Sequence, residues 1–304
     1  MKKIILITLS IIMIPFLIVS LFIKTNEIKF YYSENMNVRV KRESKNTIEE
    51  VPFEDYVVGV LAGEMPVSFD LEALKAQAVA ARTYVMKKMA DNENNEYDIV
   101  DTVQNQVYIS NEELKEKWKD NYSERINKVK QAVLETKGEY LTYNGKIIEA
   151  FFFSTSVGKT ENSEEIFSSA EPYLRSVDSS WDAEVSPVFS ESNEFSLQEF
   201  YDKLNLKYQE KLNIKITETT STGRIKKIKI NNKNFTGSKV YSLLGLRSTF
   251  FTIEQVGSNV VVTTKGYGHG VGMSQYGALA MAKKGYKYDE ILKHYYQGVD
   301  IEKI

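Results

Sequence analysis

Glu64 is the residue of this sequence whose surroundings best suit acid–base chemistry. It lies between two helical patterns, with Leu61, Met65 and Val67 as apolar neighbours. A carboxyl group held among apolar side chains has a raised pKa and can act as a general acid near neutral pH. The residues alone leave a second interpretation open, in which Glu64 is a solvated residue at a helix end.

A glycine-rich run near the carboxy terminus contains the second candidate, His269. Residues 266–277 include five glycines, which let a backbone approach a ligand closely. This run offers His269 no apolar face, so a site role and a structural role both stay open. Ser274, Gln275 and Tyr276 follow and can hydrogen-bond to sugar hydroxyls. Their alternative roles are a helix N-cap and a helix surface.

Three further candidates lie on the helix predicted after Glu64. Lys75 and Arg82 are seven residues apart, so they project from one face and can hold a sugar or an anionic substituent. Gln77 points nearly the opposite way, so the three do not line a single surface. The alternative is a solvated face with a glutamine that contacts the core.

Composition and incomplete motifs exclude several kinds of chemistry. The chain has no cysteine and only two histidines, so we expect no metal and no cofactor. Lys and Arg number 39 and Asp and Glu 41, which argues against a nucleic-acid partner. Gly158-Lys-Thr160 lacks the first glycine of a phosphate loop, and Ser156-Val-Gly-Lys159 lacks the companion motifs of a serine acyl enzyme.

The elements that must position these residues are helices and hairpin-type strands without βαβ regularity, which predicts an α+β fold. Asn144-Gly145 is typical of a hairpin turn, and Gly63 is expected to end the first helix. We expect an insertion near residues 180–222. The predicted helices are 53–61, 71–89, 111–137, 273–284 and 289–297, and the predicted strands are 38–40, 140–143, 146–154, 225–230 and 260–264.

The amino terminus predicts an extracytoplasmic location. Lys2 and Lys3 precede an uncharged apolar run, residues 4–23, whose length as a helix is about 30 Å, one hydrocarbon core. We interpret residues 1–23 as a cytoplasmic tip and a single-pass signal anchor in the cell membrane, and residues 24–50 as a stem with first strands. A cleaved signal peptide is the alternative, and the body lies outside in either case.

Three blocks of this sequence resemble the stage II sporulation protein D family. The match runs from about residue 36 to the end, and the blocks occur in the family's order. The opening block is 53–66 with 74–84, the middle block is 152–156 with 159–162 and 172–174, and the closing block runs from 268–277 to 294–298.

The resemblance implies that residues 51–304 form a peptidoglycan lytic transglycosylase of sporulation. Such an enzyme cuts the bond between N-acetylmuramic acid and N-acetylglucosamine, preferably in peptide-free strands, and leaves a 1,6-anhydro end. The family's catalytic glutamate falls on Glu64. The implied partners are an amidase, stage II sporulation protein P, and a membrane protein, stage II sporulation protein M, which act with it at the septal membrane during engulfment of the forespore.

This sequence departs from some family members in two places. Segment 100–106 has none of the Cys and His ligands with which certain members bind zinc, and Val157 replaces a frequent glycine. Family domains also occur in proteins that stimulate an amidase, so a non-catalytic peptidoglycan-binding module is the competing interpretation. A metal-dependent amidase is disfavoured by the two histidines and the lack of cysteine.

Overall fold

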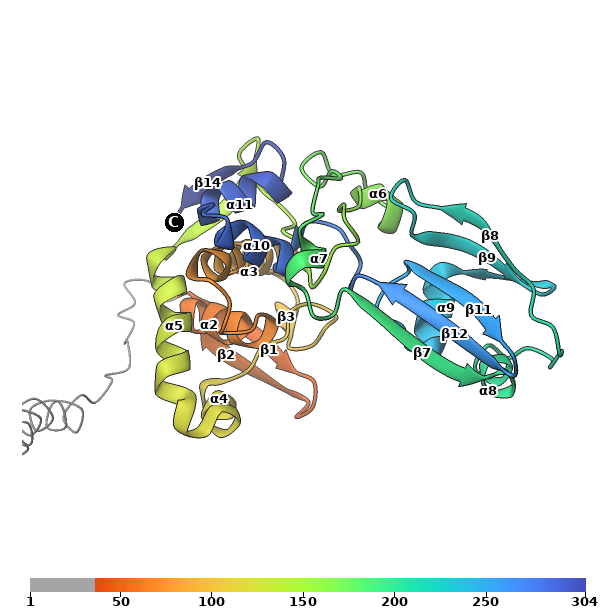
Figure 1. Cartoon of the computed structure of the whole chain (residues 1–304). Helices are drawn as coiled ribbons and strands as arrows, with labels where there is room; N and C mark the ends of the chain where they lie inside the picture. Colours follow the sequence, from red (N-terminus) through yellow and green to blue (C-terminus); the bar gives the residue numbers. More distant parts are fainter. Residues whose placement is uncertain (1–35) are drawn as a thin grey trace, which may run out of the picture.

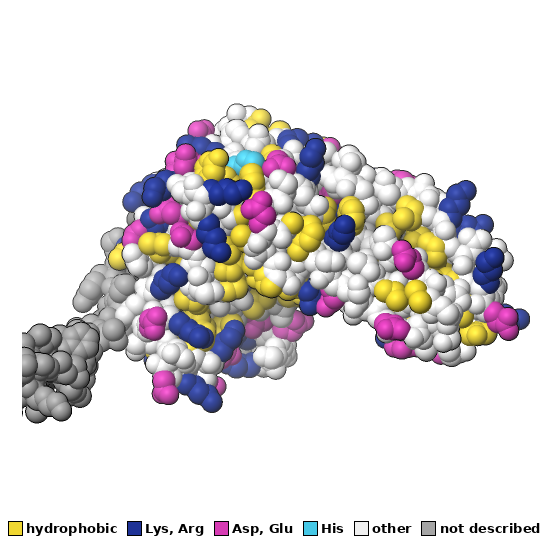
Figure 2. Space-filling model, in the orientation of Figure 1, with side chains coloured by type: hydrophobic (Ala, Val, Ile, Leu, Met, Phe, Trp, Pro, Cys, Tyr) yellow, Lys and Arg dark blue, Asp and Glu magenta, His cyan; other side chains and the backbone are white. Residues whose placement is uncertain are grey.

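The structure is a computed structural model that describes residues 36–304, and it has two lobes (Figure 1). The helical lobe comprises residues 36–189 and 266–304, and the β lobe comprises residues 190–265. The space-filling view shows a narrower waist between the two lobes (Figure 2). Helices and mainly antiparallel strand pairs confirm the α+β class. The predicted anchor, residues 4–23, lies outside the described residues, and no helix within 36–304 is long and apolar enough to cross a membrane.

The helical lobe is built around one long helix, α3 (Leu71–Asp91), which is buried on several faces. Its small residues Ala73, Ala76 and Ala80 pack in the cluster formed with α10 and α11, and Leu74 and Ala78 pack in the cluster formed with α2 and α5. Alanine favours helix and lets neighbouring helices approach closely, which explains how one helix serves several hydrophobic clusters.

Around α3, the helical lobe contains short helices and small sheets. Its elements are β1 (Asn37–Arg42), β2 (Thr47–Pro52), α2 (Phe53–Glu64), β3 (Ile99–Val100), α4 (Asn111–Trp118), a 3₁₀ turn (Lys119–Asn121), α5 (Tyr122–Glu135), β4 (Glu139–Tyr143), β5 (Lys146–Ile147), β6 (Phe152–Phe153), α6 (Ser163–Ile166), α7 (Asp182–Val185), β13 (Met273–Ser274), α10 (Gln275–Lys283), α11 (Tyr288–Tyr295) and β14 (Asp300–Lys303).

The β lobe has a hydrophobic cluster of its own, formed by residues between 195 and 262. Two three-stranded antiparallel sheets and two helices supply it. It extends well beyond the range 180–222 in which the sequence placed an insertion, and the domain division stays a prediction. Its elements are β7 (Ser190–Ser196), α8 (Leu197–Lys203), β8 (Ile214–Thr219), β9 (Ile225–Ile230), β10 (Lys233–Thr236), α9 (Gly237–Leu244), β11 (Phe251–Val256) and β12 (Asn259–Lys265).

The single helix predicted over residues 111–137 is wrong, because two helices cover this range. The chain turns at Lys119, whose φ of 47° lies in the left-handed region that ends a helix. The turn allows Trp118, at the end of α4, and Tyr122, at the start of α5, to be buried in the same cluster with α2. Burial of two large aromatic side chains therefore outweighs the helical propensity of the sequence between them.

The strand predicted over residues 146–154 is also wrong, because only its two ends are strands. β5 pairs with β4, whereas β6 pairs with β13 in a different sheet. Between them the chain leaves the first sheet, and the Glu149 N–H donates to the Tyr173 hydroxyl instead of to a carbonyl oxygen of a neighbouring strand. The hairpin turn is confirmed, since Asn144 and Gly145 both have positive φ.

Candidate functional site

Glu64 is the last residue of α2, at the break between α2 and α3. Gly63 does not end the helix as predicted, but it allows a close approach of the next segment. A Cβ on Gly63 would lie 2.4 Å from the Val107 carbonyl oxygen, and one on Gly59 would lie 2.6 Å from the Ile109 carbonyl oxygen. These two glycines therefore let residues 107–109 lie against α2, where the Val107 N–H donates to Glu64 Oε1 at 2.6 Å.

The pKa of the Glu64 carboxyl group is suited to proton donation at neutral pH. Burial raises its pKa from 4.5 to about 7, although the hydrogen bond from the Val107 N–H lowers it. The effect of burial on the pKa is the larger of the two, because one backbone donor replaces only part of the hydration that a carboxylate loses when it is buried. At pH 7 the group is therefore about half protonated, so it can give a proton and take one back.

Glu64 lies in a groove, because it lines two adjoining pockets of about 620 and 670 Å³ that also share Pro66. We call the first the cationic arm and the second the aromatic arm. The cationic arm is lined by Ala62, Gly63, Glu64, Met65, Pro66, Val67, Ser68, Lys117, Trp118, Glu124, Arg125 and Lys128. The aromatic arm is lined by Glu64, Pro66, Tyr84, Val103, Gln104, Asn105, Phe151, Phe152, Phe153, Ser154, Phe167, Val188, Tyr267, Gly268, His269, Gln275 and Tyr276.

The aromatic arm presents flat side chains beside amides, a combination suited to sugar rings and their hydroxyls. Tyr267 and Phe167 are exposed there by 43% and 37%, so their rings are open to a ligand. Gln275 approaches Glu64 from α10, and its Nε2 donates to the Glu64 carbonyl oxygen at 3.1 Å. Tyr276 packs edge-on against Phe69, with ring centroids 5.0 Å apart.

His269 lies at the wall of the aromatic arm as a neutral ring. Burial, and then the positive charge of Arg224, lower its pKa to about 4. Its Nδ1 accepts from the Val271 N–H at 3.1 Å, so this nitrogen carries no proton. Phe153 and Phe167 pack around it at 5.7 and 5.5 Å between ring centroids. The structure thus gives His269 the apolar neighbours that the glycine-rich run itself does not, and it makes the ring a poor acid–base group.

Ser274 is brought close to this region but is fully buried and lines neither arm of the groove. Its hydroxyl donates to Asp182 and accepts from the Gly277 N–H, which makes it the N-cap of α10. The predicted start of this helix is therefore confirmed, whereas a direct hydrogen bond from Ser274 to a sugar needs the side chain to become exposed.

Lys75, Gln77 and Arg82 are not brought to the groove, whose lining includes none of them. Lys75 forms ion pairs with Glu72 and Glu135. Arg82 is fully buried and pairs with Glu54, with an Nη2–Oε2 distance of 2.8 Å. The Gln77 side chain is fully buried and has no hydrogen-bond partner among the residues that the structure describes. Two of the three thus stabilise the lobe through ion pairs.

Three residues that the sequence analysis did not single out hold the site together. Val107 acts through its backbone N–H, and the identity of its side chain does not indicate this role in the sequence. Arg224 donates to the Gly268 carbonyl oxygen at 2.8 Å and so joins the β lobe to the glycine-rich run. Asp182 accepts from the Ser274 and Ser179 hydroxyls, and burial raises its pKa to about 6. Each acts across a long sequence separation that local patterns do not reveal.

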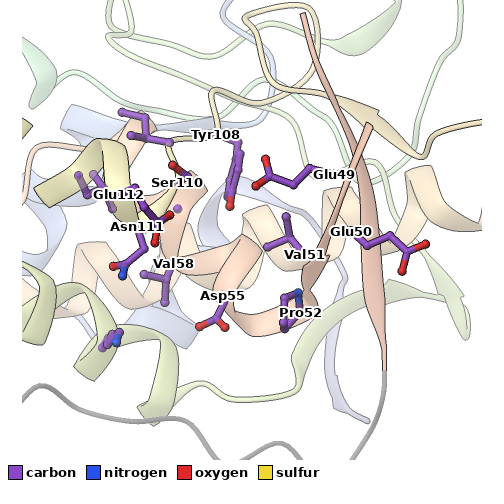
Figure 3. Close-up of a pocket in the computed structure, with 14 residues that line it drawn as sticks. Glu49, Glu50, Val51, Pro52, Asp55, Val58, Tyr108, Ser110, Asn111 and Glu112 are labelled. Carbon is purple, nitrogen blue, oxygen red and sulfur yellow. The ribbon is translucent and has the colours of Figure 1, made fainter. Parts of the chain in front are cut away.

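A separate pocket of about 440 Å³ lies beside the first half of α2 and contains none of the predicted site residues (Figure 3). Glu49, Glu50, Asp55 and Glu112 give it an acidic lining, and Tyr108 stands at its wall. Across residues 36–304, no group of three or more His, Asp or Glu side chains is placed to hold a metal ion. The groove at Glu64 is therefore the best-supported candidate for chemistry.

Comparison with known proteins places this groove in a family context. The model of the SpoIID family, described as stage II sporulation protein, matches residues 41–143, which include Glu64. Stage II sporulation protein D of Bacillus amyloliquefaciens is 45% identical over 271 residues, or 88% of this chain and 78% of the relative. The Bacillus subtilis protein of the same name is 44% identical, over 88% and 79%. The amidase enhancer of Bacillus subtilis is 32% identical over 297 residues, or 80% of this chain and 40% of that protein.

Proposed function

Since this chain belongs to the stage II sporulation protein D family, we propose that it is a lytic transglycosylase. Its substrate is the β-1,4 bond between N-acetylmuramic acid and N-acetylglucosamine in peptidoglycan, preferably in peptide-free strands. The observation that carries the proposal is one carboxyl group, that of Glu64, held in a groove with a pKa of about 7. The aromatic arm beside it is lined by no other carboxylate among the described residues.

A single carboxyl group is sufficient for this reaction. Ordinary glycosidases use two, one as acid and one as base or nucleophile. Here Glu64 gives its proton to the glycosidic oxygen as the bond from that oxygen to C1 of the muramic acid breaks. The carboxylate then takes the proton from the 6-hydroxyl of the same sugar, whose oxygen bonds to C1 and closes the 1,6-anhydro ring. The attack is intramolecular, so no water has to be positioned.

The other residues of the aromatic arm bind the strand rather than react with it. Tyr267 and Phe167 offer exposed rings to the sugar faces, and Gln104 and Asn105 offer amides to hydroxyl or acetamido groups. Gln275 fixes the end of α2 through the Glu64 carbonyl. His269 contributes a rigid neutral wall, because a ring with a pKa of about 4 does not exchange protons near pH 7.

The experiment is to incubate the purified protein with peptide-free glycan strands and to look for anhydromuramyl ends by mass spectrometry. We expect product from the wild type and a loss of about 10²- to 10⁴-fold in Glu64→Gln, which keeps the shape but has no acidic proton. Equal product from both proteins would assign the chemistry to another residue.

A second function, stimulation of an amidase by a non-catalytic peptidoglycan-binding module, is favoured by the similarity to the protein named amidase enhancer. Absence of product from the wild type, together with binding to glycan strands and a faster amidase reaction, would support this function instead. The binding surface would be the same groove.

The proposed cellular setting follows from the family and from the amino terminus. We place the body outside the cytoplasmic membrane, anchored by residues 4–23, where it acts in septal wall remodelling and forespore engulfment. Stage II sporulation proteins P and M are the proposed partners. Detection of the full chain in the membrane fraction, with the body digested by protease added to protoplasts, tests the location.

A further inference from the structure

The cationic arm of the groove carries positive charge that the protein itself does not neutralise. Lys117 is the penultimate residue of α4, and Arg125 and Lys128 lie in the first half of α5. Lys117 and Arg125 are exposed, and neither takes part in an ion pair among the described residues. Figure 2 shows Lys and Arg side chains along α5 on the face in view. By contrast, Lys75 on α3 pairs with two carboxylates.

Lys128 gives this charge a fixed position. It is half-buried, and its Nζ donates to the Phe69 carbonyl oxygen at 2.6 Å, just after the Pro66–Ser68 loop that forms the arm's wall. An ammonium group has three N–H donors, so further donors remain for a ligand. The one opposing carboxylate in the arm besides Glu64 belongs to Glu124, which is exposed.

The cations do not interfere with the acid. The pKa of Glu64 is raised by burial and lowered by the Val107 N–H, and neither Lys117, Arg125 nor Lys128 contributes to it. A cation close to the carboxyl group would favour its charged form and weaken the proton donor. The positive charge of the arm is therefore available to a charged group of a ligand without weakening the acid.

A glycan of alternating N-acetylglucosamine and N-acetylmuramic acid offers one group that can match this charge. The lactyl group of muramic acid is a carboxylate when no peptide is attached, and a neutral amide when the peptide is present. We propose that the cationic arm binds the free lactyl carboxylate of a peptide-free muramic acid residue, so that charge pairing selects peptide-free strands. This inference rests on the proposed function, because it assigns a recognition role to the same groove.

The test separates the charge of the lactyl group from the bulk of the peptide. Peptide-free strands are compared with the same strands after carbodiimide coupling of their lactyl carboxyls to methylamine, which removes the charge without adding a peptide. Peptide-bearing strands form the third substrate. Cleavage is followed as kcat/KM for anhydromuramyl ends, and binding as the Kd of strands labelled at the reducing end.

Exposed ion pairs each change an equilibrium by up to about fivefold. For the wild type we therefore expect carboxylate strands to be cut and bound roughly 5- to 20-fold better than amidated strands, with the ratio shrinking toward one near 1 M salt. Lys117→Gln/Arg125→Gln should lose most of this preference, because only Lys128 remains to pair with the carboxylate, and its kcat/KM on amidated strands should change much less than on carboxylate strands. Lys128 is kept, because its bond to Phe69 is structural.

Two matched variants sharpen the outcome. Glu124→Gln removes the opposing charge and should increase the preference for carboxylate strands by roughly two- to fivefold. Lys229→Gln/Lys239→Gln removes two exposed cations of the β lobe, which have no ion pair in the described structure, and should change nothing.

Equal kcat/KM and equal Kd for carboxylate and amidated strands would overturn the inference. It would also be overturned if the double variant lost kcat/KM and affinity to the same extent on both substrates. Preference for peptide-bearing strands would assign the cations to peptide carboxylates and would also overturn it. Failure of the proposed function looks different, because no substrate then yields anhydro ends. In that case the Kd values alone still decide whether the arm recognises the carboxylate.

Discussion

Replacing Glu64 by Gln should make the protein more stable at alkaline pH while it destroys the proposed activity. The carboxyl group has a pKa near its ordinary value of 4.5 in the unfolded chain and about 7 in the folded protein. Each pKa unit corresponds to about 1.4 kcal/mol. Keeping the charged form folded above pH 7 therefore costs at most about 3 kcal/mol, which glutamine does not incur because it stays neutral and can still accept from the Val107 N–H.

The sign of the effect follows from proton binding. The folded protein binds the Glu64 proton more tightly than the unfolded chain, so this group's contribution is full below about pH 4.5 and is lost as pH rises through 7. The wild type should thus lose up to about 3 kcal/mol of unfolding free energy between pH 4.5 and pH 8 that Glu64→Gln retains. The same ionisation should lower kcat/KM about tenfold per pH unit above 7, because the general acid must be protonated.

Urea unfolding of the wild type and Glu64→Gln at several pH values between 4.5 and 8 measures this difference. Glu124→Gln is the control, since it removes an exposed carboxylate of the same groove and should show no comparable trend. A stability difference between wild type and Glu64→Gln that does not change with pH would refute the reasoning. It would mean that Glu64 is solvated, as in the helix-end interpretation.

Two substitutions and one titration test the surroundings of the site. Gly63→Ala should cost about 1–3 kcal/mol of unfolding free energy in urea, because its Cβ would meet the Val107 carbonyl oxygen. Arg82→Met should cost about 3–5 kcal/mol in the same assay, because it leaves the buried Glu54 carboxylate without its cationic partner. The His269 ring, with a pKa of about 4, should remain neutral by NMR titration from pH 8 down to about 5, and its contribution to stability should fall as pH drops below about 6.5.

Local pattern was enough to predict the chain segments that carry the groove. The break at Glu64 follows from two helical repeats on either side of residues 65–70, and the structure has α2 end and α3 begin there. Ser274 before an apolar repeat and Gly285 after it predicted α10, and both capping roles are confirmed. These features depend on residues within one or two turns of each other, which is the range over which spacing and capping preferences act.

Long-range partners could not be predicted in the same way. Helical spacing predicts that Lys75 and Arg82 project away from Gln77, but it does not identify the residues that each face of the helix contacts. The Arg82 face meets Glu54, 28 residues earlier, so an apparent anion-binding residue is a buried structural cation. Glycine is common just after the end of a helix, which favours Gly63 as a helix terminator, whereas in the structure Gly63 allows close backbone contact with Val107.

Glu64 lies where three segments of the chain meet only after folding. Glu64 is the last residue of α2, just before an apolar loop. The Val107 N–H donates one hydrogen bond to its carboxyl group. Gln275 of α10, 211 residues further along the chain, donates to its main-chain carbonyl oxygen. A second backbone or cationic donor at the carboxyl group would return its pKa toward 4.5 and leave too little acid at pH 7. The groove thus depends as much on the donors kept away from Glu64 as on those near it, which is why its cations suit recognition of a substrate charge at a neighbouring position.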